Sequence, residues 1–136
     1  MEPNEAIQLS GFKKYFKNTG YGYTCAFDGR ETYEYQYSKD KVANEHITAI
    51  DAICYGYGNV RRQFSQKDID REIMKAYVGF KTDNSELKTV VTGNWGCGAF
   101  NGDLRLKFLI QWLACSLAKK ELVYCPFGHR ETIFHK

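Results

Sequence analysis

The stretch TGNWGCGAFNGD, residues 92–103, lies between a predicted strand and a predicted helix and combines glycines with a tryptophan and a phenylalanine. Glycines this dense let the backbone approach a ligand closely, or simply allow it to turn. A strand, a glycine loop and a helix in this order can also cradle phosphate, because the loop amides point inward and the helix start is partly positive. On glycine content alone, a bare turn is an equally good interpretation.

The glycine spacing matches neither of the common phosphate motifs. No Gly-Lys-Ser or Gly-Lys-Thr follows the strand, which excludes the Walker pattern. Gly96, Gly98 and Gly102 are spaced one residue too far for the dinucleotide fingerprint. The aromatic residues still favour a ligand, because Trp95 and Phe100 would be costly to expose in a bare turn. A nucleoside diphosphate, with its base or ribose against a ring, fits this combination.

The elements on either side of the loop predict an α/β layered domain. A strand is expected at Leu87–Gly93, a helix over residues 103–120 and a final strand at Leu122–Phe127. If the two strands are parallel, Phe127 and the loop share the sheet edge at which α/β proteins bind ligands. Two apolar stripes on the helix predict burial on two sides. The first stripe is Leu106, Leu109, Ile110, Leu113 and Leu117, and the second is Leu104, Phe108, Trp112 and Cys115.

The segments before the loop predict a buried strand and a second helix. Ile47–Tyr55 is a nearly continuous apolar run, typical of a strand buried on both faces, with Asp51 in its middle. As a lone acid, Asp51 is expected to bond to nearby backbone or hydroxyl groups rather than to act as a site acid. Ser65 and Asp68 resemble a capping box that begins a helix. The apolar residues of that helix are Ile69, Ile73, Ala76, Tyr77 and Phe80.

The N-terminal part predicts an antiparallel hairpin arm. Ala6–Phe12 is expected as a short strand, and Tyr21–Phe27 and residues 33–37 alternate with aromatic residues on one face. Asp28-Gly29 between the latter two is a hairpin turn signal. Because strand and helix alternate in the rest of the chain, the expected fold class is α/β, with a mixed sheet and flanking helices.

Composition limits the function classes. The 136 residues fit one domain, and an aromatic content of 15% argues against disorder. The net charge of +3 comes from scattered basic residues, so no nucleic-acid motif is present and only a weak preference for anionic ligands is expected. The N-terminal residues are not a secretory signal, and no segment approaches the length of a membrane span.

The cysteines favour reduced thiols in the cytosol or nucleus. Their number, five, is odd, and no Cys-x-x-Cys occurs, which argues against a secreted disulfide framework. Cys115, Cys125, His129 and His135 match no usual zinc spacing, and Cys115 falls inside the helix pattern. Neither a metal nor a cofactor is therefore expected.

Several motifs resemble those of the poly(ADP-ribose) glycohydrolases. The string from Thr92 to Phe100, followed by Gly102-Asp-x-Arg-Leu-Lys107, is similar to the diphosphate loop and following helix of that family, and it is highly specific. Three other stretches are similar in the same order, so the resemblance covers roughly residues 4–128. They are Tyr15 with Thr19-Gly20-Tyr21, then Ala49–Ala52, then Lys75–Phe80.

The resemblance implies a macrodomain embedded in a larger helical catalytic region. Members of the family cleave the ribose–ribose bonds of poly(ADP-ribose) and release ADP-ribose, which implies a role in the DNA damage response in the nucleus or cytoplasm. Tyr21 would contact the bound ADP-ribose, Phe127 would pack beside adenine or its ribose, and Phe100 would shape the distal ribose end. The residues that would wrap the diphosphate are Asn94, Trp95, Gly96, Cys97, Gly98 and Ala99.

The catalytic loop of the family has no counterpart in this chain. That loop reads Gly-Gly-Gly followed shortly by Gln-Glu-Glu, and no Glu-Glu pair occurs here. Glycosidic cleavage needs a carboxylic acid to protonate the leaving oxygen, so no catalytic residue is assigned and the chain alone is expected to be inactive. Asp103 is interpreted as a helix-capping acid, and Phe127-Gly128-His129 replaces the usual Phe-Gly-Asp. The acids that form no catalytic pair are Glu45, Asp51, Glu86, Asp103, Glu121 and Glu131.

Residues 1–136 are therefore expected to form a single, incomplete macrodomain-like domain, similar to the C-terminal half of the family's catalytic macrodomain. The other half, from another segment or chain, would supply strands that pair with Ala6–Phe12. Two interpretations stay open: part of an active glycohydrolase, or a noncatalytic relative that still binds ADP-ribose or poly(ADP-ribose). Retention of the whole string from Asn94 to Phe100 argues against a third, an interaction module that has lost the ligand.

Overall fold

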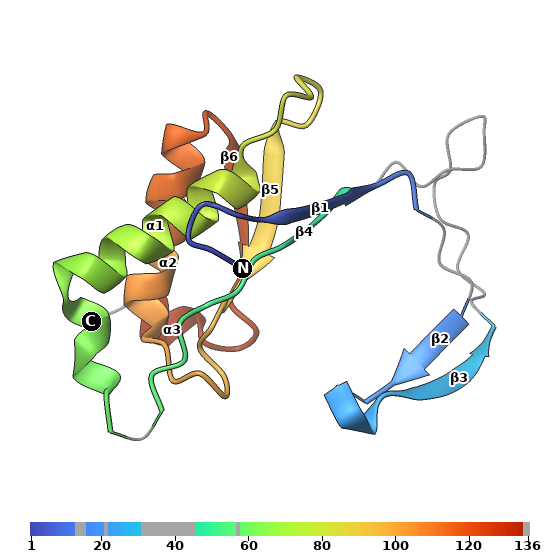
Figure 1. Cartoon of the computed structure of the whole chain (residues 1–136), viewed down its shortest axis with the longest axis horizontal. Helices are drawn as coiled ribbons and strands as arrows, with labels where there is room; N and C mark the ends of the chain where they lie inside the picture. Colours follow the sequence, from blue (N-terminus) through green and yellow to red (C-terminus); the bar gives the residue numbers. More distant parts are fainter. Residues whose placement is uncertain (13–15, 21, 31–45, 57, 135–136) are drawn as a thin grey trace. The chain divides into compact units, whose positions relative to one another are not determined.

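The structure, a computed structural model, describes residues 1–12, 16–20, 22–30, 46–56 and 58–134 (Figure 1). The chain divides into two compact units, one made of Met1–Ile7 with Thr48–Lys136 and the other of Gln8–Ile47. The elements in chain order are β1 (Ile7–Ser10), β2 (Phe16–Thr19), η1 (Gly22–Thr24), β3 (Ala26–Arg30), β4 (His46–Ala49), η2 (Val60–Phe64), α1 (Gln66–Phe80), β5 (Thr89–Gly93), α2 (Leu104–Leu117), β6 (Glu121–Cys125) and α3 (Arg130–Phe134).

The larger unit is built on a parallel pair of strands, β5 and β6, joined by α2. Their register runs from Thr89 opposite Glu121 to Gly93 opposite Cys125. This confirms the predicted order of strand, loop, helix and strand, with the boundaries of the elements differing from the predicted ones by at most three residues. Figure 1 shows α1 packed across α2. The core lies where the two helices meet the strands, and its buried members are Ala76, Phe80, Ile110, Ala114 and Cys115.

The start of α1 follows the predicted signal. The Ser65 side chain accepts a hydrogen bond from the Asp68 amide at 3.3 Å, as an N-cap residue does. The Asp68 carboxylate does not reach back to complete a capping box, because it binds the Arg62 guanidinium at 2.7 Å. The apolar face of α1 then packs against α2, as the helical spacing predicts.

The prediction of two buried stripes on α2 is only partly right, because each stripe has a buried member, Ile110 or Cys115, and exposed members as well. Only one face is buried, and two of its members, Lys107 and Gln111, are polar. They are tolerated there because each has hydrogen-bond or charge partners in the interior. The apolar side chains that stay exposed on α2 are Leu109, Trp112, Leu113 and Leu117.

The predicted strand Ile47–Tyr55 is also too long, and it is not buried on both faces. Only His46–Ala49 forms a strand, β4, and its residues are exposed. From Ile50 onward the backbone bonds to side chains instead of a neighbouring strand, since the Ile53 amide donates to the Glu72 carboxylate at 2.9 Å. The strand expected at Ala6–Phe12 forms β1, which is shorter than predicted and pairs with β4 of the same chain.

The smaller unit contains the antiparallel arm, but with different strands. β2 pairs with β3, with Phe16 opposite Arg30 and Thr19 opposite Ala26. Asp28-Gly29 lies inside β3 and not at a turn: the register shifts there, and Gly29 has a φ of +88°, as expected of a bulge. Residues 22–24 form a 3-10 turn within the predicted strand Tyr21–Phe27. The expected strand at residues 33–37 lies outside the described residues.

None of the helices in the described ranges is long and apolar enough to cross a membrane.

Candidate functional site

The glycine loop and Phe127 meet at one edge of the parallel strands. The loop leaves the carboxyl end of β5, and Phe127 follows the carboxyl end of β6. The Phe127 ring lies against Gly93, where an added Cβ would come within 2.8 Å of it. Phe127 is 78% exposed and has a φ of +48°, a backbone conformation that costs a bulky residue energy. An exposed aromatic ring held in a strained conformation is typical of a ligand contact.

Backbone and side-chain hydrogen bonds fix the loop in place. The Gly102 amide donates to the Gly96 carbonyl at 2.9 Å, which closes the loop on itself. The Asn94 amide group donates to the Pro126 carbonyl at 3.0 Å and accepts from the Tyr124 hydroxyl at 3.0 Å. Asn94 therefore ties the loop to β6, and its side-chain amide is engaged by the protein on both atoms.

The middle of the loop holds backbone donors with no protein acceptor. Within the described residues, the N–H groups of Gly96, Gly98, Ala99 and Phe100 donate no hydrogen bond. The Phe100 carbonyl, by contrast, accepts from the Tyr55 amide at 3.1 Å, so the loop is anchored while its donors stay available. Backbone N–H groups gathered in this way are suited to bind an anion.

The glycines divide the loop into two sides. An added Cβ at Gly98 would meet nothing within 4 Å. At Gly96, where φ is +74°, it would lie 2.6 Å from the Ala52 Cβ, and at Gly102 it would lie 2.7 Å from the Gly96 carbonyl oxygen. We call the side at Gly96 and Gly102 the packed side and the side at Gly98 the open side. Of these three glycines, only Gly98 faces space that no described protein atom fills.

Trp95 belongs to the packed side. Its indole N–H donates to the Ile50 carbonyl at 3.2 Å, and its ring packs on the core. The Lys107 ammonium lies 4.2 Å from the centre of the ring, within the range of a cation–π contact. Trp95 is therefore an anchor of the loop, and the exposed rings available to a ligand at this edge are those of Phe127 and Phe100.

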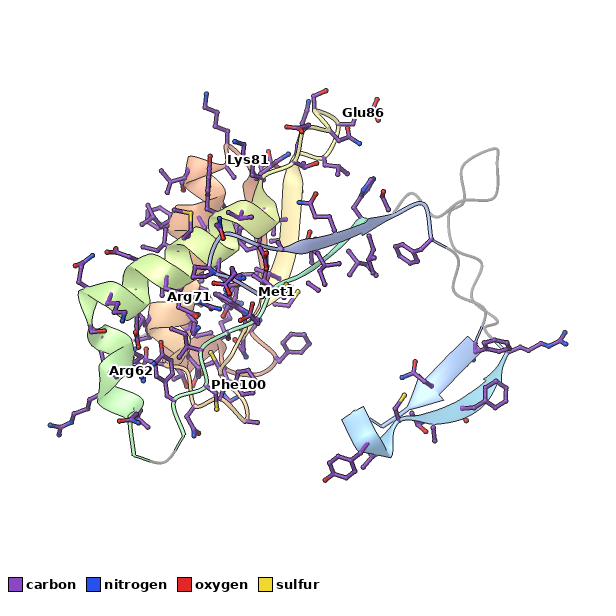
Figure 2. The ribbon with its side chains drawn as sticks, in the orientation of Figure 1. Met1, Arg62, Arg71, Lys81, Glu86 and Phe100 are labelled. Atoms are coloured by element: carbon purple, nitrogen blue, oxygen red, sulfur yellow. The ribbon has the colours of Figure 1, made fainter. Side chains whose placement is uncertain are left out.

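Phe100 is the last predicted contact residue within the loop, which lies at the carboxyl end of β5. Figure 2 shows it at the end of the larger unit away from Glu86, which precedes β5. Its side chain is exposed. Tyr21, the remaining predicted contact, lies outside the described residues.

Cys97 is not suited to act as a nucleophile. Burial, with a further contribution from the Asp103 carboxylate, raises the pKa of its thiol to about 11. The thiol donates to the Trp95 carbonyl at 3.5 Å. It therefore stays protonated at neutral pH, and only the thiolate is a strong nucleophile.

Asp103 caps α2, as predicted. Its carboxylate accepts from the Leu106 amide at 2.9 Å, and its own amide donates to the Gln63 side chain at 2.6 Å. A carboxylate at this position offsets the positive end of the helix dipole. Positive potential for an anion at the loop therefore comes from the loop amides more than from the helix start.

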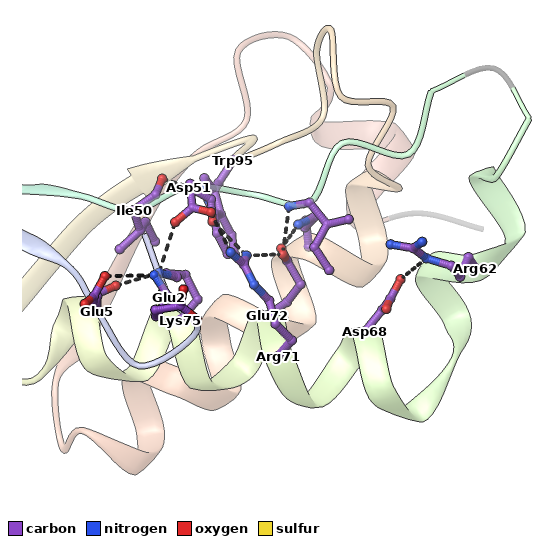
Figure 3. A network of polar contacts seen from close by, with 12 residues as sticks. Glu2, Glu5, Ile50, Asp51, Arg62, Asp68, Arg71, Glu72, Lys75 and Trp95 are labelled. Carbon is purple, nitrogen blue, oxygen red and sulfur yellow. Dashed lines mark hydrogen bonds and ion pairs between the residues drawn. The ribbon is translucent and has the colours of Figure 1, made fainter.

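A buried ionic network lies beneath the packed side (Figure 3). Lys107 is ion-paired with Glu72, and both side chains are 1% exposed. Glu72 also accepts from Arg71 at 2.7 Å, and Arg71 binds Asp51 at 2.5 Å. Lys75 completes the network, 3.0 Å from Asp51 and donating to the Glu5 carbonyl at 2.6 Å.

The network corrects the expectation for Asp51 and adds residues that the motifs do not mark. Asp51 is held by two cations, Arg71 and Lys75, and not by backbone or hydroxyl groups. Burial alone would raise the pKa of its carboxyl, but the hydrogen bonds and charges of Lys75 and Arg71 lower it below its ordinary value. Glu72 could have been found from its spacing, because Glu72, Lys75 and Ala76 share one helical face.

A comparison with known proteins decides the family. The family model described as "Poly (ADP-ribose) glycohydrolase (PARG), Macro domain fold" matches residues 1–133. The chain belongs to the poly(ADP-ribose) glycohydrolase family. Its fold is accordingly the macrodomain fold of that family.

Curated relatives agree with this assignment. The chain is 36% identical to poly(ADP-ribose) glycohydrolase 1 of Caenorhabditis elegans, over 96% of this chain and 18% of that protein. It is 30% identical to poly(ADP-ribose) glycohydrolase 2 of the same organism, over 93% of this chain and 28% of that protein. It is 28% identical to the probable poly(ADP-ribose) glycohydrolase 2 of Arabidopsis thaliana, over 94% and 32%. The chain thus spans less than a third of the length of each of these glycohydrolases.

The acids near the loop of this glycohydrolase-family chain are all engaged. Asp51 and Glu72 are bound by cations, and Asp103 is bound by a helix amide. None of them offers a free carboxyl group toward the open side. Among the described residues, no group of three or more His, Cys, Asp or Glu side chains could hold a metal ion.

Proposed function

We propose that this chain binds the ADP-ribose unit of poly(ADP-ribose), with the diphosphate on the open side of the glycine loop. The observation that carries the proposal is the set of unbonded N–H groups at Gly96, Gly98, Ala99 and Phe100 beside open space. A diphosphate supplies several charged acceptors within the span of such a loop. The Asn94 side chain supports the loop through its bonds to Pro126 and Tyr124.

Phe127 and Phe100 would contact the rest of the nucleotide. Phe127 stands at the same edge, exposed, where its ring can pack beside adenine or the adjacent ribose. Phe100 would border the distal ribose, and Tyr21 would add a further contact. The likeness to the family string from Asn94 to Phe100 supports this order of contacts along the ligand.

We further propose that glycosidic cleavage needs a carboxylic acid other than those that the described residues place beside the loop. Protonation of a leaving ribose oxygen requires a carboxyl group free to approach it. The carboxylates of Asp51, Glu72 and Asp103 are committed to other partners. The chain would therefore serve as the binding part of a poly(ADP-ribose) glycohydrolase-type domain, whose hydrolysis depends on a complementary catalytic part.

Calorimetry with the purified 136-residue chain tests binding. ADP-ribose is expected to bind, and adenosine is expected to bind at least about tenfold more weakly because it lacks the diphosphate. Equal affinities would contradict a diphosphate site, and no heat from a folded sample with ADP-ribose would overturn the proposal. Release of ADP-ribose from poly(ADP-ribose) by the same sample would overturn the second part, on the missing acids.

A further inference from the structure

The Lys107 side chain reaches from α2 to several points of the packed side. Its Nζ would lie 3.3 Å from a Cβ placed on Gly96, and its Cε would lie 3.0 Å from one placed on Gly102. The same Nζ lies 4.2 Å from the centre of the Trp95 ring. The end of one side chain therefore lies against both residues joined by the closing hydrogen bond of the loop, with its ammonium beside Gly96 and its Cε methylene beside Gly102.

Glu72 holds this ammonium from the opposite direction. Its carboxylate is ion-paired with Lys107 and also accepts from the Ile53 amide and from Arg71. Arg71 in turn binds the Asp51 carboxylate and the Asp51 carbonyl. Through these contacts the loop is tied to α1 and to the segment at residues 51–53.

Stability alone does not explain a buried ion pair at this place. Taking an ammonium and a carboxylate out of water is costly, and apolar side chains of similar volume often stabilise a core as well or better. The rest of the buried face of α2 is partly apolar, with Ile110, Ala114 and Cys115 in the core. Lys107 differs from these residues because it touches the loop.

We propose that Lys107 is a positioning residue: the end of its side chain, held by Glu72, packs against Gly96 and Gly102 and so fixes the loop with its amides toward the diphosphate. The inference rests on the proposed function of the loop. Lys107 does not touch the ligand itself, since its side chain is 1% exposed and lies on the packed side. Its effect on affinity passes through the conformation of the loop.

Two variants distinguish a role of Lys107 in positioning the loop from a role in neutralising the charge of Glu72. Lys107→Met removes one of the two cations that bind the buried Glu72 carboxylate and leaves Arg71, so both the melting temperature and the affinity for ADP-ribose are expected to fall. The double variant with Lys107→Met and Glu72→Gln removes both charges. It is expected to recover most of the melting temperature, while its Kd for ADP-ribose stays at least about tenfold above that of the wild-type chain.

Lys75→Met is the matched control. Lys75 is as deeply buried as Lys107 and is also ion-paired, but its partners are Asp51 and the carbonyls of Glu2 and Glu5. Its loss is expected to lower the melting temperature and to leave the Kd for ADP-ribose of the folded protein within about twofold. A Kd raised as much as in the Lys107 variants would show that any loss of a buried lysine weakens binding, and it would overturn the proposal.

Two results would decide against the proposal directly. If the double variant regains stability and binds ADP-ribose within twofold of wild type, the role of Lys107 is only to neutralise the charge of Glu72. If neither Lys107 variant folds, hydrogen exchange of the Gly102 amide in Glu72→Gln decides, because the lysine side chain remains and only its anion is lost. Exchange is expected to be faster than in wild type, and an unchanged rate would contradict the proposal.

The exchange experiment needs no ligand. If wild-type chain fails to bind ADP-ribose while Glu72→Gln still loosens Gly102, the proposed function of the loop fails but Lys107 still positions it. If wild-type chain binds and the double variant binds equally well, only the role of Lys107 fails.

Discussion

The two sides of the glycine loop use the same residue type for opposite purposes. On the packed side, Gly96 and Gly102 leave no room for a Cβ, and the space is filled by Ala52, Lys107 and the loop itself. On the open side, a Cβ at Gly98 would touch no protein atom. The fold therefore requires the first two glycines, whereas no described contact of the protein requires the third. Glycine content alone could not make this distinction.

A substitution on the packed side is expected to have the largest effect. Gly96→Ala would place a methyl group 2.6 Å from the Ala52 Cβ in a backbone region with φ of +74°. The left-handed conformation costs about 1–2 kcal/mol and overpacking about 1–3 kcal/mol, so a loss of about 2–5 kcal/mol in unfolding free energy is expected. Urea unfolding measures this loss, and a value below about 0.5 kcal/mol would show that the fold does not require a glycine at position 96.

Phe127→Gly is expected to weaken ligand binding without lowering stability. Glycine relieves the strain of the +48° φ, and the lost ring is mostly exposed, so the variant should be about as stable as the wild-type chain. Losing the aromatic contact of about 0.5–1.5 kcal/mol would weaken ADP-ribose binding up to about tenfold. Calorimetry and thermal unfolding together check this, and a marked fall in melting temperature would assign Phe127 to the fold instead.

The smallest expected effect is a pH dependence within the network below the loop. The folded pKa of Asp51 is lowered by Lys75 and Arg71, so its stabilising contribution is full above the unfolded value of 3.8 and is lost as pH falls through the folded pKa. Asp51→Asn should therefore be less stable than the wild-type chain at pH 6, and the difference should shrink at pH 3. Urea unfolding at both values measures it; a difference that grows on acidification would contradict the sign.

Local patterns were sufficient to predict the elements around the loop. β5, α2 and β6 follow from apolar periodicity and punctuation by glycine and proline, which act over a few residues. The Asp103 cap could likewise be predicted, because a capping acid sits next to the amides that it accepts from.

Features set by distant partners could not be predicted in this way. The run from Ile47 to Tyr55 has the composition of a strand, but the Ile53 amide donates to Glu72 and the Tyr55 amide to the Phe100 carbonyl, both in other elements. The burial of Lys107 on α2 could not be predicted, because a lysine is expected to be exposed unless an interior partner such as Glu72 is known. The bond of the Trp95 indole to the Ile50 carbonyl likewise joins residues far apart in the sequence, so no local pattern could predict it.

The central claim is that the open side of the loop holds the diphosphate, and Gly98→Ala tests it most directly. Gly58→Ala is the matched control, because an added Cβ at Gly58 also meets nothing within 4 Å and Gly58 lies outside the loop. Both variants should unfold within about 0.5 kcal/mol of wild type. Calorimetry should then find ADP-ribose affinity reduced about tenfold or more in Gly98→Ala and unchanged in Gly58→Ala. Equal affinities in the two variants and the wild-type chain would contradict the claim.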